Sequence, residues 1–317
     1  MKKIAIFCTE YHDNSGGIIV MHYLCHLLRG LGVDAYMFPR FGNFLINFAL
    51  NNDKRYLDYL GDNFAKSLEI FGQKKYKTNP SFDTPVIFET PPGGFNDDWV
   101  VIYPENTLGN PLSAKNIVRW LLAPPLEHQP VFSVNKNEYL VKHGAGVGKT
   151  QINDVYSSER YLNIQYLMED VYNQENISTK RNGTAYCLRK GKGRKIVHEL
   201  NNSICIDGLS HAETAVVFKK VETFISYDVA TFYSQYAVMC GANSVVVPQP
   251  IFTTEQWREM PGKCGIAYGF EELSWAADTK HLLKKYYLEK NTENIKQCSD
   301  FIQDIHQYFS QNYLEAA

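Results

Sequence analysis

A run of basic residues near the middle of the chain has the composition of a phosphate-binding loop. Five cations lie within seven residues, directly after the short apolar segment 184–188: Arg189, Lys190, Lys192, Arg194 and Lys195. Guanidinium and ammonium groups make the charge-assisted hydrogen bonds that a diphosphate requires. Charge runs are often only solvated loops, but a place directly after a strand favours binding. We therefore expect Arg189 and Lys190 to contact phosphate, with Lys195 beside them.

A second anion site is expected near the amino terminus. Ser15, Gly16 and Gly17 end a polar loop and lead into a segment with helical spacing of apolar residues, 18–31. The first turn of a helix has unpaired N–H groups, and glycine lets a ligand approach the backbone. Gly16 and Gly17 are thus predicted ligand contacts, although two glycines could also simply form the turn.

Acidic and imidazole side chains lie where a general base would be needed. His12 and Asp13 lie in the loop after the first apolar segment, and Glu105 follows another one at 99–103. A group transfer to a hydroxyl acceptor uses such a base to remove the proton. We rank Asp13 first, His12 second and Glu105 third; each could instead be a turn or capping residue.

The elements that position these residues alternate between strand and helix. Residues 3–8, 18–31 and 33–38 predict a strand, a helix and a strand, which form one βαβ unit. Further strands are expected at 84–90, 99–103 and 131–141, with an amphipathic helical stretch at 113–122. In the second half the strands are 184–188, 203–207, 223–227 and 244–248, and helices begin near 212 and 229. The pattern predicts an α/β protein with two Rossmann-like, doubly wound domains.

The domain boundary is expected in a polar stretch without hydrophobic periodicity, residues 173–181. This gives an N-terminal acceptor-side domain at 1–180 and a C-terminal nucleotide-sugar-binding domain at 181–300. Residues 301–317 belong to a C-terminal helix that could cross back to the first domain.

Composition excludes several partners. A formal net charge of −2 across 317 residues argues against nucleic acid. Seven cysteines without a CxxC pair, and an amino terminus without a signal-peptide core, predict a cytoplasmic protein. The histidines lack ligand spacing, so no metal is expected. The segment HGAGVGKT (143–150) has His143 where a P-loop requires glycine, and is not one.

The segment YDVATFYSQYAVMCG (227–241), followed by SVVVP, resembles the donor-binding region of GT-B glycosyltransferases. The resemblance implies two domains that face each other across a cleft and a nucleotide-sugar donor, without a divalent metal. Asp228 and Tyr236 stand where the retaining branch carries two glutamates, for the sugar and the ribose. Because Tyr236 is no carboxylate, inversion or retention stays open; Thr231 and Ser234 are alternative contacts for phosphate or ribose.

VVIYPENTLGNPLSAKNIVRWLL (100–122) and GIAYG (265–269) resemble transferases assigned to capsule and O-antigen gene clusters. This resemblance implies a glycan or lipid-linked acceptor on the bacterial surface-glycan pathway, and places Glu105, Asn110 and Arg119 near the cleft. The apolar residues at 40–50, flanked by cations, suggest peripheral contact with the inner face of the inner membrane or a core-facing helix. A non-catalytic glycan-assembly protein and another nucleotide-dependent sugar enzyme remain alternatives.

Overall fold

The chain divides into two compact units, residues 1–166 with 292–317 and residues 167–291. The computed structural model describes residues 2–40, 70, 72–107, 109–123, 138–144, 147, 155–229 and 231–315. The predicted membrane-contacting segment, apart from Arg40, and most of the P-loop-like segment lie outside these residues. None of the helices described is long and apolar enough to cross a bilayer.

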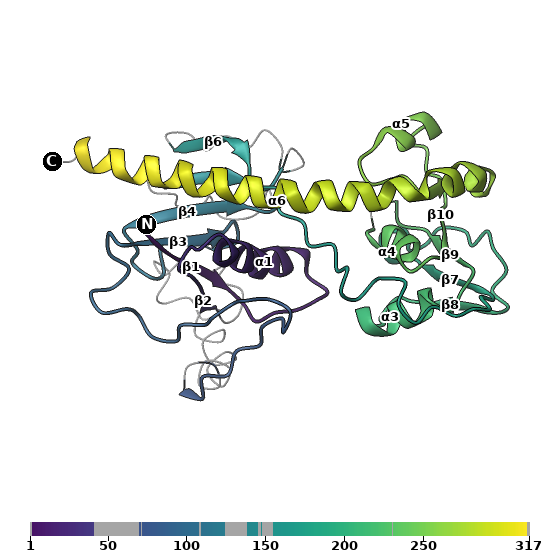
Figure 1. Cartoon of the computed structure of the whole chain (residues 1–317), viewed down its shortest axis with the longest axis horizontal. Helices are drawn as coiled ribbons and strands as arrows, with labels where there is room; N and C mark the ends of the chain where they lie inside the picture. The colour runs from purple at the N-terminus through teal and green to yellow at the C-terminus, as the bar shows by residue number, and fades with distance from the viewer. Residues whose placement is uncertain are drawn as a thin grey trace. The chain divides into compact units, whose positions relative to one another are not determined.

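The first unit is built on a six-stranded parallel sheet. Its elements are β1 (Lys3–Cys8), α1 (Gly16–Gly30), β2 (Ala35–Pro39), β3 (Trp99–Pro104), β4 (Asn116–Leu121), β5 (Tyr139–Lys142) and β6 (Tyr156–Tyr161) (Figure 1). The strand order is β2-β1-β3-β4-β5-β6. The chain therefore adds β2 on one side of β1 and then β3 on the other, which makes the β1/β3 boundary the topological switch point.

Both faces of this sheet are covered. On one face α1 and the C-terminal part of α6 (Leu273–Glu315) pack on the strands, with Leu24, Phe301 and Ile305 in a shared core. On the other face Phe7 and Tyr103 pack with Phe95, from the segment between β2 and β3. Burial on both faces explains why these strands are apolar runs without alternation.

The helix predicted at 113–122 is wrong, because this stretch forms strand β4. Its polar residues Asn116 and Arg119 gave it an amphipathic pattern, yet every residue of β4 is buried. Asn116 donates to the Trp99 carbonyl at 2.7 Å, and Arg119 is paired with Glu138. Polar side chains that are hydrogen-bonded inside a core give the same sequence pattern as side chains that face solvent. The predicted strand at 84–90 contributes only an isolated bridge between Val86 and Met37.

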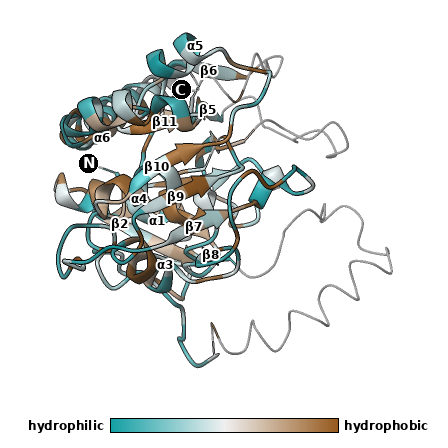
Figure 2. Ribbon diagram, turned by 90° about the vertical axis from the view of Figure 1, so that its right-hand side faces the viewer, coloured by the Kyte–Doolittle hydropathy of each residue, from teal (hydrophilic) through white to brown (hydrophobic). Residues whose placement is uncertain are grey.

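The second unit repeats the architecture with five parallel strands. Its elements are β7 (Thr184–Cys187), β8 (Ser203–Cys205), α3 (His211–Phe218), β9 (Thr223–Ser226), α4 (Tyr233–Met239), β10 (Asn243–Val246), α5 (Thr254–Glu259) and β11 (Ile266–Tyr268). The order β11-β10-β9-β7-β8 places its switch point between β7 and β9. The central strands β9 and β10 are largely apolar, as Figure 2 shows. Both units are thus Rossmann-like and doubly wound, which confirms the predicted fold class.

The chain passes between the two units after residue 166 and again after residue 291. The polar stretch 173–181 lies inside the second unit, where the Arg181 guanidinium donates to the carbonyls of Phe218 (3.0 Å), Val221 (2.8 Å) and Cys240. Helix α6 begins in the second unit and contributes residues from Thr292 onward to the first.

Candidate functional site

The predicted functional residues gather at the carboxyl edges of the two sheets. In doubly wound sheets ligands bind outside the carboxyl ends of the strands, at the switch point. In the second unit this edge is formed by the loops after β7 and β9, which contain the basic run and Asp228. In the first unit it is formed by the loops after β1 and β3, which contain His12, Asp13 and Glu105.

The basic loop begins with an unusual backbone turn. Leu188 has φ −98° and ψ −54°, and Arg189 has a left-handed φ of 43°. Their two N–H groups donate to the same oxygen, Asp207 Oδ2, at 3.0 and 3.1 Å. The Arg189 side chain is exposed and its guanidinium lies 5.1 Å from the Tyr233 ring centroid, a distance at which a cation is attracted to the ring face.

The far end of the loop is clamped to the sheet. Arg194 donates to the Tyr227 carbonyl at 2.7 Å and to the Pro248 carbonyl at 2.6 Å, so it ties the ends of β9 and β10 together. Gly191 lies so close to the strand that a Cβ there would overlap the Tyr227 carbonyl oxygen. Lys190, Lys192 and Lys195 are exposed. The loop therefore presents four of its five cations outward and uses Arg194 as a structural tie.

The residues after β9 lie deeper than the sequence suggested. Asp228 is 4% exposed, and its charge acts on Lys263, whose pKa burial lowers and Asp228 raises. Tyr236 is 5% exposed and stacks on Tyr172 with ring centroids 4.2 Å apart. Both are built into the interior, and their assignment to sugar and ribose stays a prediction.

The two hydroxyl residues of this segment differ in accessibility. Ser234 is fully buried on α4, and its hydroxyl has no partner among the described residues. Thr231 is half-buried before α4 and accepts from the Tyr233 N–H at 3.3 Å. Of the predicted contacts near α4, Thr231 is the one a ligand could reach without rearrangement.

At the edge of the first sheet, Glu105 is held beside the start of α1. Its Oε2 accepts from the Leu122 N–H at 3.0 Å, and burial raises the pKa of the carboxyl group. A Cβ on Gly17 would lie 3.5 Å from the Leu122 side chain, which brings the first turn of α1 next to this strand end. Gly16 is exposed at the start of the helix. Ser15 precedes it in an extended conformation and its side chain makes no capping bond.

The other two base candidates lie in the loop after β1. His12 is exposed and its Nδ1 accepts from the Asn14 N–H at 3.2 Å; Asp13 is half-buried. Tyr76 and His22 hold the start of this loop. The Tyr76 hydroxyl lies 2.7 Å from the Thr9 carbonyl oxygen, and His22 Nε2 lies 3.0 Å from the same oxygen. Burial lowers the pKa of His22 to about 4, so it is neutral at pH 7.

Arg119 was expected near the cleft, but its buried pairing with Glu138, next to the loop after β3, was not predicted. Arg119 and Glu138, each 1% exposed or less, pair through two contacts of 3.1 Å. Arg119 also donates to the carbonyls of Thr107 (2.5 Å) and Gly109 (2.8 Å). Arg40, also buried, donates to Asn106 Oδ1 at 2.5 Å. The available signal was an arginine inside the apolar run NIVRWLL.

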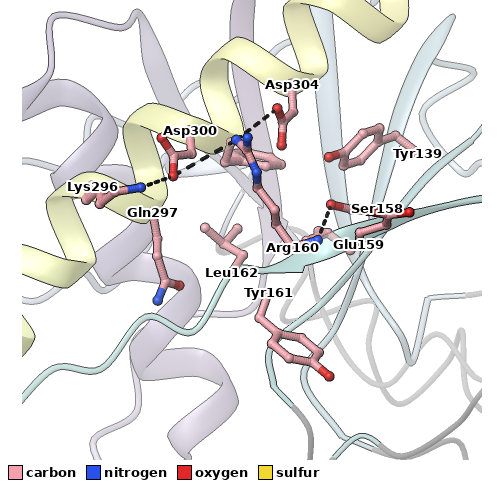
Figure 3. Close-up of a pocket in the computed structure, with 12 residues that line it drawn as sticks. Tyr139, Ser158, Glu159, Arg160, Tyr161, Leu162, Lys296, Gln297, Asp300 and Asp304 are labelled. Carbon is pink, nitrogen blue, oxygen red and sulfur yellow. Dashed lines mark hydrogen bonds and ion pairs between the residues drawn. The ribbon is translucent and has the colours of Figure 1, made fainter.

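The two larger of the cavities lined by described residues lie away from these edges. One, of about 370 Å³, lies between β5, β6 and α6 in the first unit. Figure 3 shows Arg160 reaching across it toward Asp300 and Asp304, at 4.0 and 3.3 Å, with Lys296 bonded to Asp300 at 2.6 Å. The two cations and the two carboxylates therefore form ion pairs with one another. The other, of about 290 Å³, lies beside α4 and the start of α6 in the second unit. Within the described part of the chain no cluster of three metal-ligating side chains occurs.

Comparison with known proteins gives structural similarities only. No family model matches the chain, and no curated protein matches it. Among solved structures, the glycosyltransferase VinC in complex with dTDP is similar at 10% identity and a TM-score of 0.34, over 98% of this chain and 100% of that one. Acinetobacter baumannii MurG is similar at 10% identity and 0.31, over 96% and 100%. The fold assignment therefore rests on the two parallel sheets and their strand orders.

Proposed function

We propose that the protein is a glycosyltransferase that moves a sugar from a nucleotide-diphosphate donor to a glycan or lipid-linked acceptor. The observation that carries the proposal is the exposed cationic loop at the switch point of the second unit. A doubly wound unit binds ligands there, and three lysines and an arginine directed at solvent suit a diphosphate. The GT-B resemblance of residues 227–241, in the same unit, supports the same donor class.

Donor binding uses Arg189 and Lys190, with Lys195 in the same exposed loop and Thr231 at the same sheet edge. When the glycosidic bond breaks, negative charge develops on the departing nucleoside diphosphate. Guanidinium and ammonium groups placed at that charge stabilise it in the transition state. We therefore expect transfer without a divalent metal ion. Gly16 and Gly17, at the start of α1, offer a second set of N–H groups for the donor.

Among the base candidates, Glu105 has structural support. A carboxylate whose pKa is raised toward neutrality by burial is better suited to accept a proton at pH 7, and the Leu122 N–H orients it. Asp13 and His12 remain alternatives on the neighbouring loop. Inversion or retention is left to product analysis.

The acceptor is proposed from the resemblance of residues 100–122 to transferases of capsule and O-antigen clusters. A growing surface glycan on a lipid carrier would bring a cytoplasmic enzyme to the inner face of the inner membrane. The alternative is a glycan-assembly protein that keeps the fold and binds nucleotide without turnover.

The test measures nucleoside-diphosphate binding by calorimetry and slow hydrolysis of a panel of nucleotide sugars, both in EDTA. Replacing Arg189 and Lys190 by alanine should weaken binding at least about tenfold, because two charge-assisted contacts are lost. The double variant Lys280→Ala and Lys284→Ala is the matched control, since it removes two exposed lysines of the same unit.

Several outcomes would contradict the proposal. Wild-type affinity in the Arg189/Lys190 variant would refute the donor site, and a strict need for manganese would refute metal independence. Binding without any hydrolysis would favour the non-catalytic alternative. In the same assay, the Glu105→Gln and Asp13→Asn variants separate the base candidates.

A further inference from the structure

Asp207 lies beside the cationic loop and takes part in its structure. It follows β8, the neighbour of β7 in the sheet. Its Oδ2 accepts from the N–H groups of Leu188 and Arg189 at 3.0 and 3.1 Å. The two residues that begin the cationic loop are therefore tied to a carboxylate of the same chain.

The backbone at this turn has the form of an anion-binding cradle. Leu188 is in the right-handed helical region, with φ −98° and ψ −54°, and Arg189 is left-handed, with φ 43°. A right-handed residue followed by a left-handed one directs successive N–H groups into one concavity, which binds phosphates in many proteins. A left-handed arginine is uncommon and is maintained only by surrounding structure. Here the bound anion is Asp207.

The charge of Asp207 is only partly compensated. Its second oxygen, Oδ1, is buried and has no hydrogen-bond partner among the described residues. Within the part of the chain that the structure describes, no ion pair reaches this carboxylate, and the Arg189 guanidinium lies over Tyr233 instead. A negative charge therefore lies under a loop whose exposed side chains are cationic.

We propose that Asp207 is an internal anion that occupies the backbone cradle of the Arg189 loop and limits how tightly the loop binds phosphate. The N–H groups of Leu188 and Arg189 are not available to an incoming diphosphate, which at this turn contacts the side chains of Arg189 and Lys190 instead. The carboxylate charge repels that diphosphate and favours its release. This inference rests on the proposed function and concerns the same donor site.

The experiment separates the charge of Asp207 from its hydrogen bonds. In Asp207→Asn the amide oxygen still accepts from both N–H groups, and the charge is gone. We expect pyrophosphate and thymidine diphosphate to bind about fivefold more tightly than to the wild type at low salt, because one repulsive charge close to the site is removed. The gain should shrink as ionic strength rises. Glu222→Gln, an exposed carboxylate before β9 at the opposite edge, should leave both dissociation constants unchanged.

A second variant covers a failure of Asp207→Asn to fold, which thermal melting would reveal. Asp207→Ser also provides a neutral acceptor, and it should likewise bind pyrophosphate more tightly than the wild type. A folded Asn or Ser variant that binds equally or more weakly overturns the inference. If the wild type binds both ligands and the Arg189/Lys190 variant does not, equal or weaker binding by the Asp207 variants refutes this inference and leaves the proposed function standing. If the wild type binds neither ligand, the proposed function fails first.

Discussion

The two sheet edges have the same topology but use their cations in opposite ways. At the first edge Arg40 and Arg119 are buried and bind oxygens of Asn106, Thr107 and Gly109. At the second edge Arg189 and Lys190 are exposed, above a turn that is held by Asp207. A switch point thus determines where a loop lies, and the direction of its charges determines whether the loop binds a ligand or supports a neighbouring residue.

Arg194 shows that both uses can occur in one loop. It lies five residues after Arg189, yet its guanidinium donates to carbonyls at the ends of β9 and β10. Arg119 donates in the same way to carbonyls of the loop after β3. The comparison predicts that substitutions at the first edge affect mainly stability, and those of exposed cations at the second edge affect mainly binding.

The largest expected effect is on the buried pair of the first edge. Arg119→Met removes the buried ion-pair partner of Glu138 and the donors to Thr107 and Gly109. Such a broken pair costs about 3–5 kcal/mol in the free energy of unfolding, which urea denaturation measures. Arg160→Met, whose ion pair is half-exposed, is the control and should cost less than about 1 kcal/mol. Equal losses in the two variants would mean that the buried pair has no special role.

An intermediate effect is expected at the clamp of the second edge. In Gly191→Ala the added Cβ overlaps the Tyr227 carbonyl oxygen, and backbone must move to relieve it. Overpacking of this kind typically costs about 1–3 kcal/mol. Because the displaced loop contains Arg189 and Lys190, nucleoside-diphosphate binding should weaken as well.

Gly30→Ala, in open space at the end of α1, is the matched control. Alanine favours a helix over glycine by up to about 1 kcal/mol, so this variant should not lose stability, and its binding should be unchanged. Unfolding curves and calorimetry of both variants give the answer. Unchanged stability together with unchanged binding in Gly191→Ala would show that the loop is not pressed against β9.

Much of the fold could be predicted because strand and helix periodicities reflect burial directly. The apolar runs at 3–8, 223–227 and 244–248 are strands, and the position of the basic loop after β7 followed from that alternation. The helix predicted at 113–122 was wrong because Arg119 is buried with a partner 19 residues away, and a sequence pattern does not contain that pairing.

The site was less predictable for the same reason. Asp228 and Tyr236 have the spacing of the expected donor contacts, but Asp228 is 4% exposed and Tyr236 is buried against Tyr172. Asp207 gave no signal in sequence, since its role depends on the backbone conformation of Leu188 and Arg189. Contacts that depend on dihedral angles or on distant partners require the structure.

The smallest expected effect is a pH dependence at Glu105. Burial raises the pKa of its carboxyl group in the folded protein, so folding favours the protonated form. The stability that this provides is fully present below the unfolded-state pKa of about 4.3, and it is lost as pH rises through the folded-state pKa.

Glu105→Gln resembles the protonated form at every pH and keeps an acceptor for the Leu122 N–H. Between pH 4 and pH 8 the melting temperature of the variant should therefore rise relative to that of the wild type. This change should be smaller than the decrease in melting temperature that Gly191→Ala causes. Glu222→Gln, exposed at the opposite edge of the second sheet, should show no comparable trend. A difference that shrinks with rising pH would mean that Glu105 is stabilised as a carboxylate, and it would remove the reason for preferring it to Asp13 as the base.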